Sequence, residues 1–175
     1  MKMKKRFMMF LCFIISLVLL GACQKDNEEP AIQFSSGSVQ LTSIYYGDRY
    51  NEDEAQIEKK IQYFMIGKRF DELPSVIYGE QIQIQAQNFS TKKYEIYDYL
   101  LDGKGNIISE YEMTPTLVKV MEKGMAIFTF EPSHNAKVYA DYAIDHQLAH
   151  CILIRSKIYK SDFAFATLIL SEEEI

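Results

Sequence analysis

Gln81-Ile82-Gln83-Ile84-Gln85-Ala86-Gln87 is the stretch of this sequence that decides the fold. Ile82, Ile84 and Ala86 alternate strictly with four glutamines, so a pleated strand would place all three apolar side chains on one face. A helix would instead scatter the glutamines around its circumference. The pattern therefore predicts a half-buried β-strand.

A turn signal further along the chain indicates antiparallel structure. Asp102-Gly103-Lys104-Gly105-Asn106 is rich in residues that tolerate positive φ, and it predicts a hairpin between residues 94–101 and 106–113. Further strands are expected at 38–46, 117–121, 125–131, 137–144, 151–159 and 163–170. Strands at a spacing of roughly 8–12 residues are typical of a β-sandwich or a small barrel, so we expect a mainly β protein.

Residues 54–66 fit two structures. Four apolar residues have helical spacing, and Asp53 or Asn51 would cap such a helix (Ile57, Ile61, Phe64 and Met65). Residues 61–66 also suit a buried strand, followed by a turn at Gly67-Lys68. We expect one short helix near 54–66 that runs into a strand, with Pro74 ending the segment.

The N-terminus predicts a targeting signal and not part of the fold. A basic start precedes the apolar run Phe7–Leu20, which is shorter than the roughly 20 residues of a membrane-spanning helix and fits the apolar region of a signal peptide. Leu20-Gly21-Ala22-Cys23 then gives an aliphatic residue, two small residues and a cysteine. This order resembles the signal and lipobox of bacterial lipoproteins. The resemblance implies that residues 1–22 are cleaved and that Cys23 carries lipid, which attaches the protein to a membrane.

Residues 23–31 are expected to be the lipidated cysteine and a polar tether. Gln24-Lys25-Asp26-Asn27-Glu28-Glu29 is short and mostly acidic, and it resembles the export signal of Bacteroidota surface lipoproteins. Gln24 also differs from the aspartate that retains lipoproteins at an inner membrane. The resemblance implies a lipid anchor in the outer membrane with exposure on the cell surface, and retention on the periplasmic face is the alternative.

Residues 32–175 have the length of a single domain. Within them, residues 79–130 combine a Gly-Glu pair, an alternating strand, a Tyr-rich strand and an Asp-Gly-x-Gly-Asn turn. This order resembles the immunoglobulin-like modules of Bacteroidota surface lipoproteins, and the fold it implies is an immunoglobulin-like antiparallel β-sandwich. The chain has no tryptophan, so the Cys…Trp…Cys framework of antibody domains is absent.

The charge of the mature chain limits its possible binding partners, and its cysteine content limits its possible disulfides. Removal of residues 1–22 takes away four basic residues and no acidic one, which lowers the formal net charge from −5 to −9. This balance argues against a nucleic-acid partner and against electrostatic docking onto anionic lipid. Once Cys12 is cleaved off and Cys23 carries lipid, Cys151 has no disulfide partner, and its apolar neighbours predict a small buried side chain.

Asp145-His146-Gln147-Leu148-Ala149-His150-Cys151 is the candidate metal site. On a helix, His146 and His150 would share a face, at a spacing similar to the His-Glu-x-x-His motif of zinc proteases. Gln147 stands where that motif needs its general-base glutamate, and an amide cannot take the proton. The alternative is a polar loop at a strand end, where this spacing does not chelate. We expect no cofactor.

Tyr94, Tyr97, Tyr99 and Tyr111 are the candidate ligand-binding residues, since tyrosine rings stack on sugars and on partner proteins. The alternative is that they are cross-strand pairs at the edge of the core. With no catalytic residue assigned, we expect a non-catalytic surface lipoprotein that binds a glycan or a protein, or acts as an accessory module. A structural subunit of an envelope, pilus or secretion assembly that pairs edge strands and a small hydrolase with loop-borne catalytic residues are the alternatives.

Overall fold

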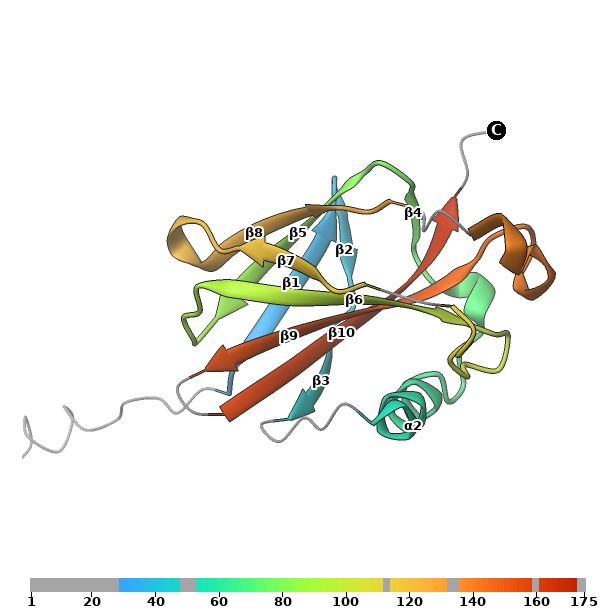
Figure 1. Cartoon of the computed structure of the whole chain (residues 1–175), viewed down its shortest axis with the longest axis horizontal. Helices are drawn as coiled ribbons and strands as arrows, with labels where there is room; N and C mark the ends of the chain where they lie inside the picture. The colour runs from blue at the N-terminus through green and yellow to red at the C-terminus, as the bar shows by residue number, and fades with distance from the viewer. Residues whose placement is uncertain (1–28, 48–52, 112–113, 132–135, 159–160, 173–175) are drawn as a thin grey trace, which may run out of the picture.

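The computed structural model describes residues 29–47, 53–111, 114–131, 136–158 and 161–172 of the chain. It is mainly β, with two antiparallel sheets and one short α-helix, consistent with the predicted β-sandwich (Figure 1). The predicted cleavage and lipidation sites, including Cys23, lie outside the described residues. No helix within the described ranges is long and apolar enough to cross a membrane.

The smaller sheet has four strands in the order β2-β1-β5-β8. Their bounds are Val39–Leu41 (β2), Ala31–Ser36 (β1), Gln81–Gln87 (β5) and Met125–Thr129 (β8). The predicted alternation of β5 is confirmed, because Ile82 and Ile84 are buried while Gln81 and Gln83 are exposed. Ile84 pairs with Phe34 on one side and Ala126 on the other, so its strand lies in the interior of the sheet.

The larger sheet has the order β3-β10-β9-β6-β7. Its strands are Ile44–Gly47 (β3), Ser161–Glu172 (β10), Ala149–Ile158 (β9), Lys93–Leu101 (β6) and Thr116–Lys119 (β7). A short strand, β4 (Ser75–Ile77), runs parallel to the end of β10. The core between the two sheets takes apolar side chains from both, including Phe34, Ile82, Tyr94, Ile154 and Phe165.

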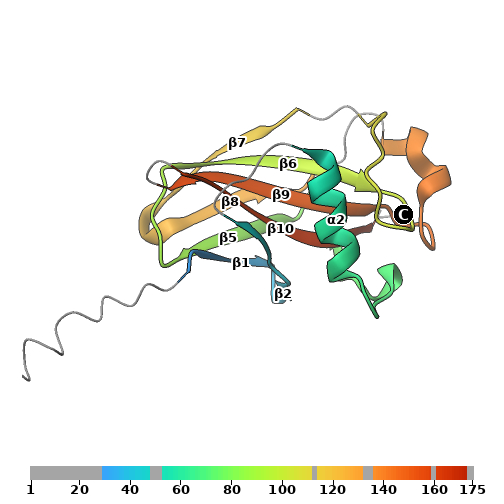
Figure 2. The same cartoon turned by 90° about the horizontal axis from the view of Figure 1, so that it is seen from below.

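Helix α2 (Glu54–Phe64) covers the outer face of the larger sheet (Figure 2). Asp53 caps it by accepting a hydrogen bond from the Ala55 N–H (3.0 Å). Ile57 and Ile61 are fully buried in a second core with residues of β9 and β10. These two strands are therefore buried on both faces, which explains why 151–154 and 164–170 are nearly continuous in apolar residues.

The predicted helix near 54–66 is confirmed, but its continuation into a strand is wrong. The chain turns after Phe64 and forms a 3-10 helix, η1 (Phe70–Glu72), before β4. The helical spacing prevails because a helix brings Ile57, Ile61 and Met65 onto the sheet together, whereas a strand would turn Lys59 toward the same face as Ile57 and Ile61.

The strand expected at 137–144 is also wrong, because residues 136–142 form a 3-10 helix, η3 (Ala136–Tyr142). Val138 is 75% exposed there, so the alternating apolar residues have no buried face to fill. The hairpin turn at Asp102–Asn106 is present, since the Asp102 carboxylate accepts hydrogen bonds from two backbone N–H groups. The second arm of the expected hairpin, residues 106–113, forms no strand within its described part and makes only the isolated bridge Leu101–Ile107. The edge of β6 pairs instead with β7.

The N-terminal boundaries differ in two places. The strand expected at 38–46 is divided into β2 and β3, and β1 already begins at Ala31, inside the expected tether. A further 3-10 helix, η2 (Glu122–Gly124), leads into β8.

Candidate functional site: a cleft between the free edges of the two sheets

The two sheets are open where β7 and β8 form their outermost strands. A cleft of about 690 Å³ lies there. Ile96 and Phe130 are its most buried lining residues, while Leu117 and Met121 are exposed at 65% and 46%. Val118, Ile127 and Phe128 add to its apolar lining. The polar and charged lining residues are Gln81, Asp98, Thr114, Thr116, Lys119, Thr129 and Glu131. The cleft thus combines an apolar interior with polar hydrogen-bonding groups, as ligand sites commonly do.

Asp98 is the carboxylate of this cleft that a buried histidine holds in place. Its Oδ1 lies 2.7 Å from Nδ1 of His150, whose Nε2 lies 3.1 Å from the Tyr78 hydroxyl. An ionised carboxylate only accepts hydrogen bonds, so Nδ1–H donates to Asp98 and, in the neutral imidazole, Nε2 accepts from Tyr78. The three residues form one hydrogen-bonded chain from β6 through β9 to the segment after β4.

Aromatic rings fix the imidazole in this position. The Phe130 ring meets His150 edge to face at a centroid distance of 5.0 Å, and Tyr78 stacks on Phe130 at 4.9 Å. His150 is only 1% exposed. Of the hydrogen-bonded chain, Asp98 alone lines the cleft, so the site offers a ligand a carboxylate of fixed orientation that accepts hydrogen bonds from N–H or O–H groups.

The buried groups near this carboxylate are poorly placed for catalysis. Both ring nitrogens of His150 are engaged by protein groups, so the imidazole has no free nitrogen for a molecule in the cleft. Cys151 is fully buried, as expected. Burial, and secondarily the charge of Asp98, raises the pKa of its thiol, which keeps Cys151 protonated and unreactive.

The structure does not bring His146 and His150 together on a helix face. Asp145 and His146 form a two-residue turn with positive φ at both positions (49° and 70°), between the paired residues Ile144 and Gln147. His146 is exposed in this turn, whereas His150 is buried in β9. Across the described ranges, no group of three or more His, Cys, Asp and Glu side chains is arranged to hold a metal ion.

The four candidate tyrosines lie in three different places. Tyr94 is fully buried in the core between the sheets, which leaves its ring no surface for a ligand. Tyr97 and Tyr99 stack on the outer face of the larger sheet at 6.4 Å. Tyr111 packs edge to face against Tyr139 at 5.4 Å. The structure therefore brings together only Tyr97 and Tyr99.

Sequence reasoning missed Asp98 and Tyr78. A usable signal was present in β6, because Asp98 lies between Ile96 and Leu100 on the face of the strand that alternation assigns to the interior. An acidic residue at an inward position needs a hydrogen-bonding partner. The partners themselves carry no local signal, because His150 is 52 residues from Asp98 and 72 from Tyr78.

Fold and cleft together define a mainly β protein with two sheets and an open lateral cleft. No protein-family model matches the chain, and no curated protein or solved structure is significantly similar to it. Its function is therefore argued from its own residues.

Proposed function

We propose that this protein is a lipid-anchored, non-catalytic binding or accessory module of the outer membrane, exposed on the cell surface. In this proposal its ligand, a glycan or a protein segment, occupies the cleft between β7 and β8. The observation that carries the proposal is the Asp98 carboxylate, which lines the cleft and is held by the buried His150. A fixed acceptor inside an apolar cleft is suited to orient a ligand, since little side-chain entropy remains to be lost on binding.

This arrangement supports binding over hydrolysis, the second alternative from the sequence. A general base must reach the proton that it removes, at about 2.6–3.2 Å or through one water. Asp98 lines the cleft, but the histidine behind it is 1% exposed and bonded at both nitrogens. The chain Asp98–His150–Tyr78 therefore resembles a rigid support more than a proton relay.

One observation favours pairing of edge strands as a second candidate function. β7 has no strand on its outer side among the described residues, and Leu117 in its middle is 65% exposed. An extended segment of a partner could add to this edge through main-chain hydrogen bonds. A structural subunit of an envelope assembly would use the same region as a ligand-binding module.

The order of the strands supports an immunoglobulin-like assignment of the sandwich. If β1, β5 and β8 are strands A, B and E, the smaller sheet contains A-B-E in the immunoglobulin order. The larger sheet then reads G-F-C-C′ through β10, β9, β6 and β7. β2 and β3 are additions next to β1 and β10. Ligand sites at loops or sheet edges are common on this architecture, so the assignment is compatible with binding.

The lipid anchor is tested by mass spectrometry of the protein purified from its own membrane. The expected N-terminus is a lipid-modified Cys23, and Cys23→Ala should lose both the lipid mass and the membrane association. Cys12→Ala is the matched control, because it changes a cysteine of the segment that is expected to be removed. Protease treatment of intact cells then tests surface exposure. An unmodified Cys23 in the membrane-bound protein would overturn the anchor.

The cleft is tested by a pair of exposed threonines in different places. Thr116 pairs with the inward-facing Ile96, so Thr116→Glu puts a charge in the cleft, while Thr42→Glu puts the same charge between β2 and β3, away from the cleft lining. Both variants should fold, because both positions are exposed. With glycan arrays and pull-downs from outer-membrane extracts as probes, ligand retention should fall for Thr116→Glu alone. Equal retention by both variants would remove the cleft from the proposal.

A further inference from the structure

One end of the sandwich is the point from which the chain leaves toward Cys23. β1 begins there at Ala31, paired with Gln87 at the end of β5, and Asn88 Nδ2 donates to the Glu29 carbonyl oxygen (3.3 Å). β6 and β10 also begin at this end, and β7 and β9 finish there. We call it the tether end; it lies on the left of Figure 1.

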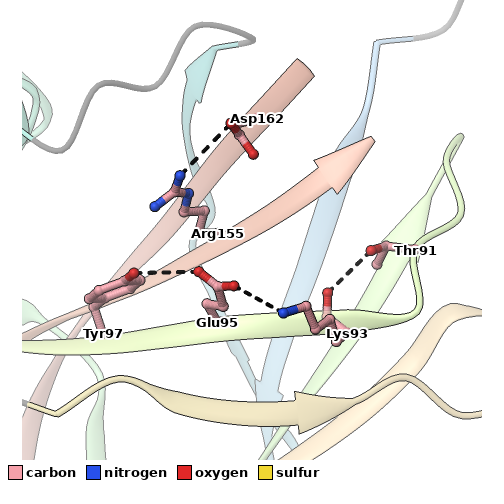
Figure 3. A network of polar contacts seen from close by, with 6 residues as sticks. All are labelled: Thr91, Lys93, Glu95, Tyr97, Arg155 and Asp162. Atoms are coloured by element: carbon pink, nitrogen blue, oxygen red, sulfur yellow. Dashed lines mark hydrogen bonds and ion pairs between the residues drawn. The ribbon is translucent and has the colours of Figure 1, made fainter. Parts of the chain in front are cut away.

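Cationic side chains gather at the tether end. Two of them form ion pairs, with Lys93 Nζ 3.2 Å from Glu95 Oε1 and Arg155 Nη2 3.8 Å from Asp162 Oδ2 (Figure 3). Lys93 and Lys119 are directly opposite each other on β6 and β7, and like charges in that relation destabilise a sheet. The whole group, the tether-end cations, comprises Lys92, Lys93, Lys119, Lys123, Arg155 and Lys157.

Most of this positive charge is not neutralised within the fold. Lys92, Lys119, Lys123 and Lys157 make no ion pair with another described residue. Lys92, Lys93, Arg155 and Lys157 line an open pocket of about 590 Å³ together with Ser90, Thr91 and Ser156. The carboxylates of Glu95 and Asp162 also line it and pair with Lys93 and Arg155, so Lys92 and Lys157 supply its net positive charge. Ammonium, guanidinium and hydroxyl groups around one hollow are the donors that a phosphate or another anion requires.

The opposite end of the sandwich has the opposite character. Carboxylates predominate in the loops and strand ends there, among them Glu80, Asp102, Glu110, Asp145 and Glu172. The formal charge of −9 that the mature chain would carry is therefore unevenly distributed, and the strand directions place the positive part of the fold at the end from which the mostly acidic tether leaves. The net charge of the mature chain argued against electrostatic docking onto anionic lipid. A net charge, however, does not show how the charges are divided between the tether end and the opposite end.

We propose that the tether end docks onto the anionic headgroups of the membrane that holds the lipid on Cys23. The proposal rests on the lipid anchor of the preceding section. Ala31 lies eight positions after Cys23, so the tether spans at most about 29 Å even when extended. Because the Debye length is only about 8 Å at physiological salt, the cations act when this end is close to the surface. Each exposed lysine then strengthens membrane partition by about fivefold.

The test uses the mature chain, residues 23–175, made without lipid and with Cys23→Ser, which retains every described residue. It is mixed with vesicles of equimolar phosphatidylglycerol and phosphatidylcholine, and with pure phosphatidylcholine vesicles, at low salt. The cluster variant carries Lys92→Gln, Lys123→Gln and Lys157→Gln, none of which lines the cleft between β7 and β8. The matched control carries Lys59→Gln, Lys60→Gln and Lys104→Gln, which make the same charge change away from the tether end.

The expected result is co-sedimentation with the anionic vesicles only, lost in added salt, with at least about a tenfold loss of partition in the cluster variant and little loss in the control. Equal losses in both variants, or no preference for anionic vesicles, would overturn the proposal. Inorganic phosphate, exchanged for chloride at constant ionic strength, separates the sources of the anion. Saturable phosphate binding without vesicle binding would assign the pocket to a free anion and also overturn it. Because the chain in this assay has no lipid, its outcome is independent of the mass of Cys23 that tests the anchor.

Discussion

Replacement of Tyr94 by phenylalanine is expected to stabilise the protein. The Tyr94 side chain is fully buried between the sheets, and no group in the described chain forms a hydrogen bond with its hydroxyl. A buried hydroxyl without a partner costs about 1–3 kcal/mol in proteins. Removing it leaves a void of about 15 Å³, which costs about 0.4 kcal/mol at about 24 cal/mol per Å³. The net gain in unfolding free energy is therefore about 0.5–2.5 kcal/mol.

Alkaline titration gives an independent measure of the same group. Burial raises the pKa of Tyr94 from 10.0 to about 12. Between these two values the unfolded chain has lost the phenolic proton and the folded chain has kept it, so stability falls as pH rises through that window. A difference of about two pKa units corresponds to at most about 2.7 kcal/mol. Tyr94→Phe should lack this component of alkaline destabilisation.

Urea denaturation at neutral pH and at pH 10–12 measures both effects. Tyr63→Phe, at a position that is 76% exposed, is the control and should leave the unfolding free energy unchanged. A destabilisation of more than about 1 kcal/mol by Tyr94→Phe would refute the reasoning, because it would mean that the hydroxyl makes a stabilising hydrogen bond. An alkaline slope identical to that of the unaltered protein would contradict the role assigned to burial.

Three further outcomes test other parts of the fold. His150→Ala leaves both Asp98 and the Tyr78 hydroxyl without their partner, and we expect urea denaturation to show a loss of about 2–4 kcal/mol. Gly105→Ala should lower the melting temperature, because Gly105 has a φ of +82° and a Cβ there would lie 3.2 Å from both Ile61 Cγ2 and Phe70 Cζ; Gly103→Ala, with nothing within 4 Å, should be nearly neutral. Partial burial acts to raise the pKa of Asp102, but hydrogen bonds from Asn106 and Lys104 lower it by more. The net result is a pKa below the ordinary value for aspartate. The stability that these bonds supply is present above the unfolded pKa and is lost as pH falls through the folded pKa, so Asp102→Asn should flatten the acid limb of a plot of stability against pH.

Local patterns predicted the strands whose two faces differ. The alternation of β5 follows directly from one buried and one exposed face, and it could be read without knowledge of the partner strands. Residues 137–144 show why the same reasoning fails elsewhere. Alternation specifies a face but not what covers it, and nothing buries the side chain of Val138, which is 75% exposed. β9 and β10 correspond to the strands predicted at 151–159 and 163–170, but burial on both faces removes their alternation, so no exposed face could be assigned to them.

The candidate site was less predictable than the fold because it depends on contacts between distant residues. His150 was singled out for its spacing from His146, yet its partners are Asp98 and Tyr78 on other segments. The spacing of two residues in the sequence predicts whether their side chains share a face only when the secondary structure between them is known. Since residues 149–158 form a strand and Asp145-His146 a turn, an i, i+4 pair has no common face there. The inward position of Asp98 on β6 was the one local indication that a polar partner would be needed.

The two proposed surfaces are compatible with one orientation at the membrane. The cleft extends along the side of the sandwich, from Met121 near the tether end to Thr114 and Glu131 near the opposite end. Docking by the tether-end cations would direct the long axis of the sandwich away from the membrane, because the carboxylates of the opposite end are repelled by anionic headgroups. The mouth of the cleft would then face sideways and remain open to a ligand or to the strand of a neighbouring protein. Neutralising Lys92, Lys123 and Lys157, which do not line the cleft, should consequently loosen the orientation without changing the affinity of the cleft, whereas Thr116→Glu should do the reverse.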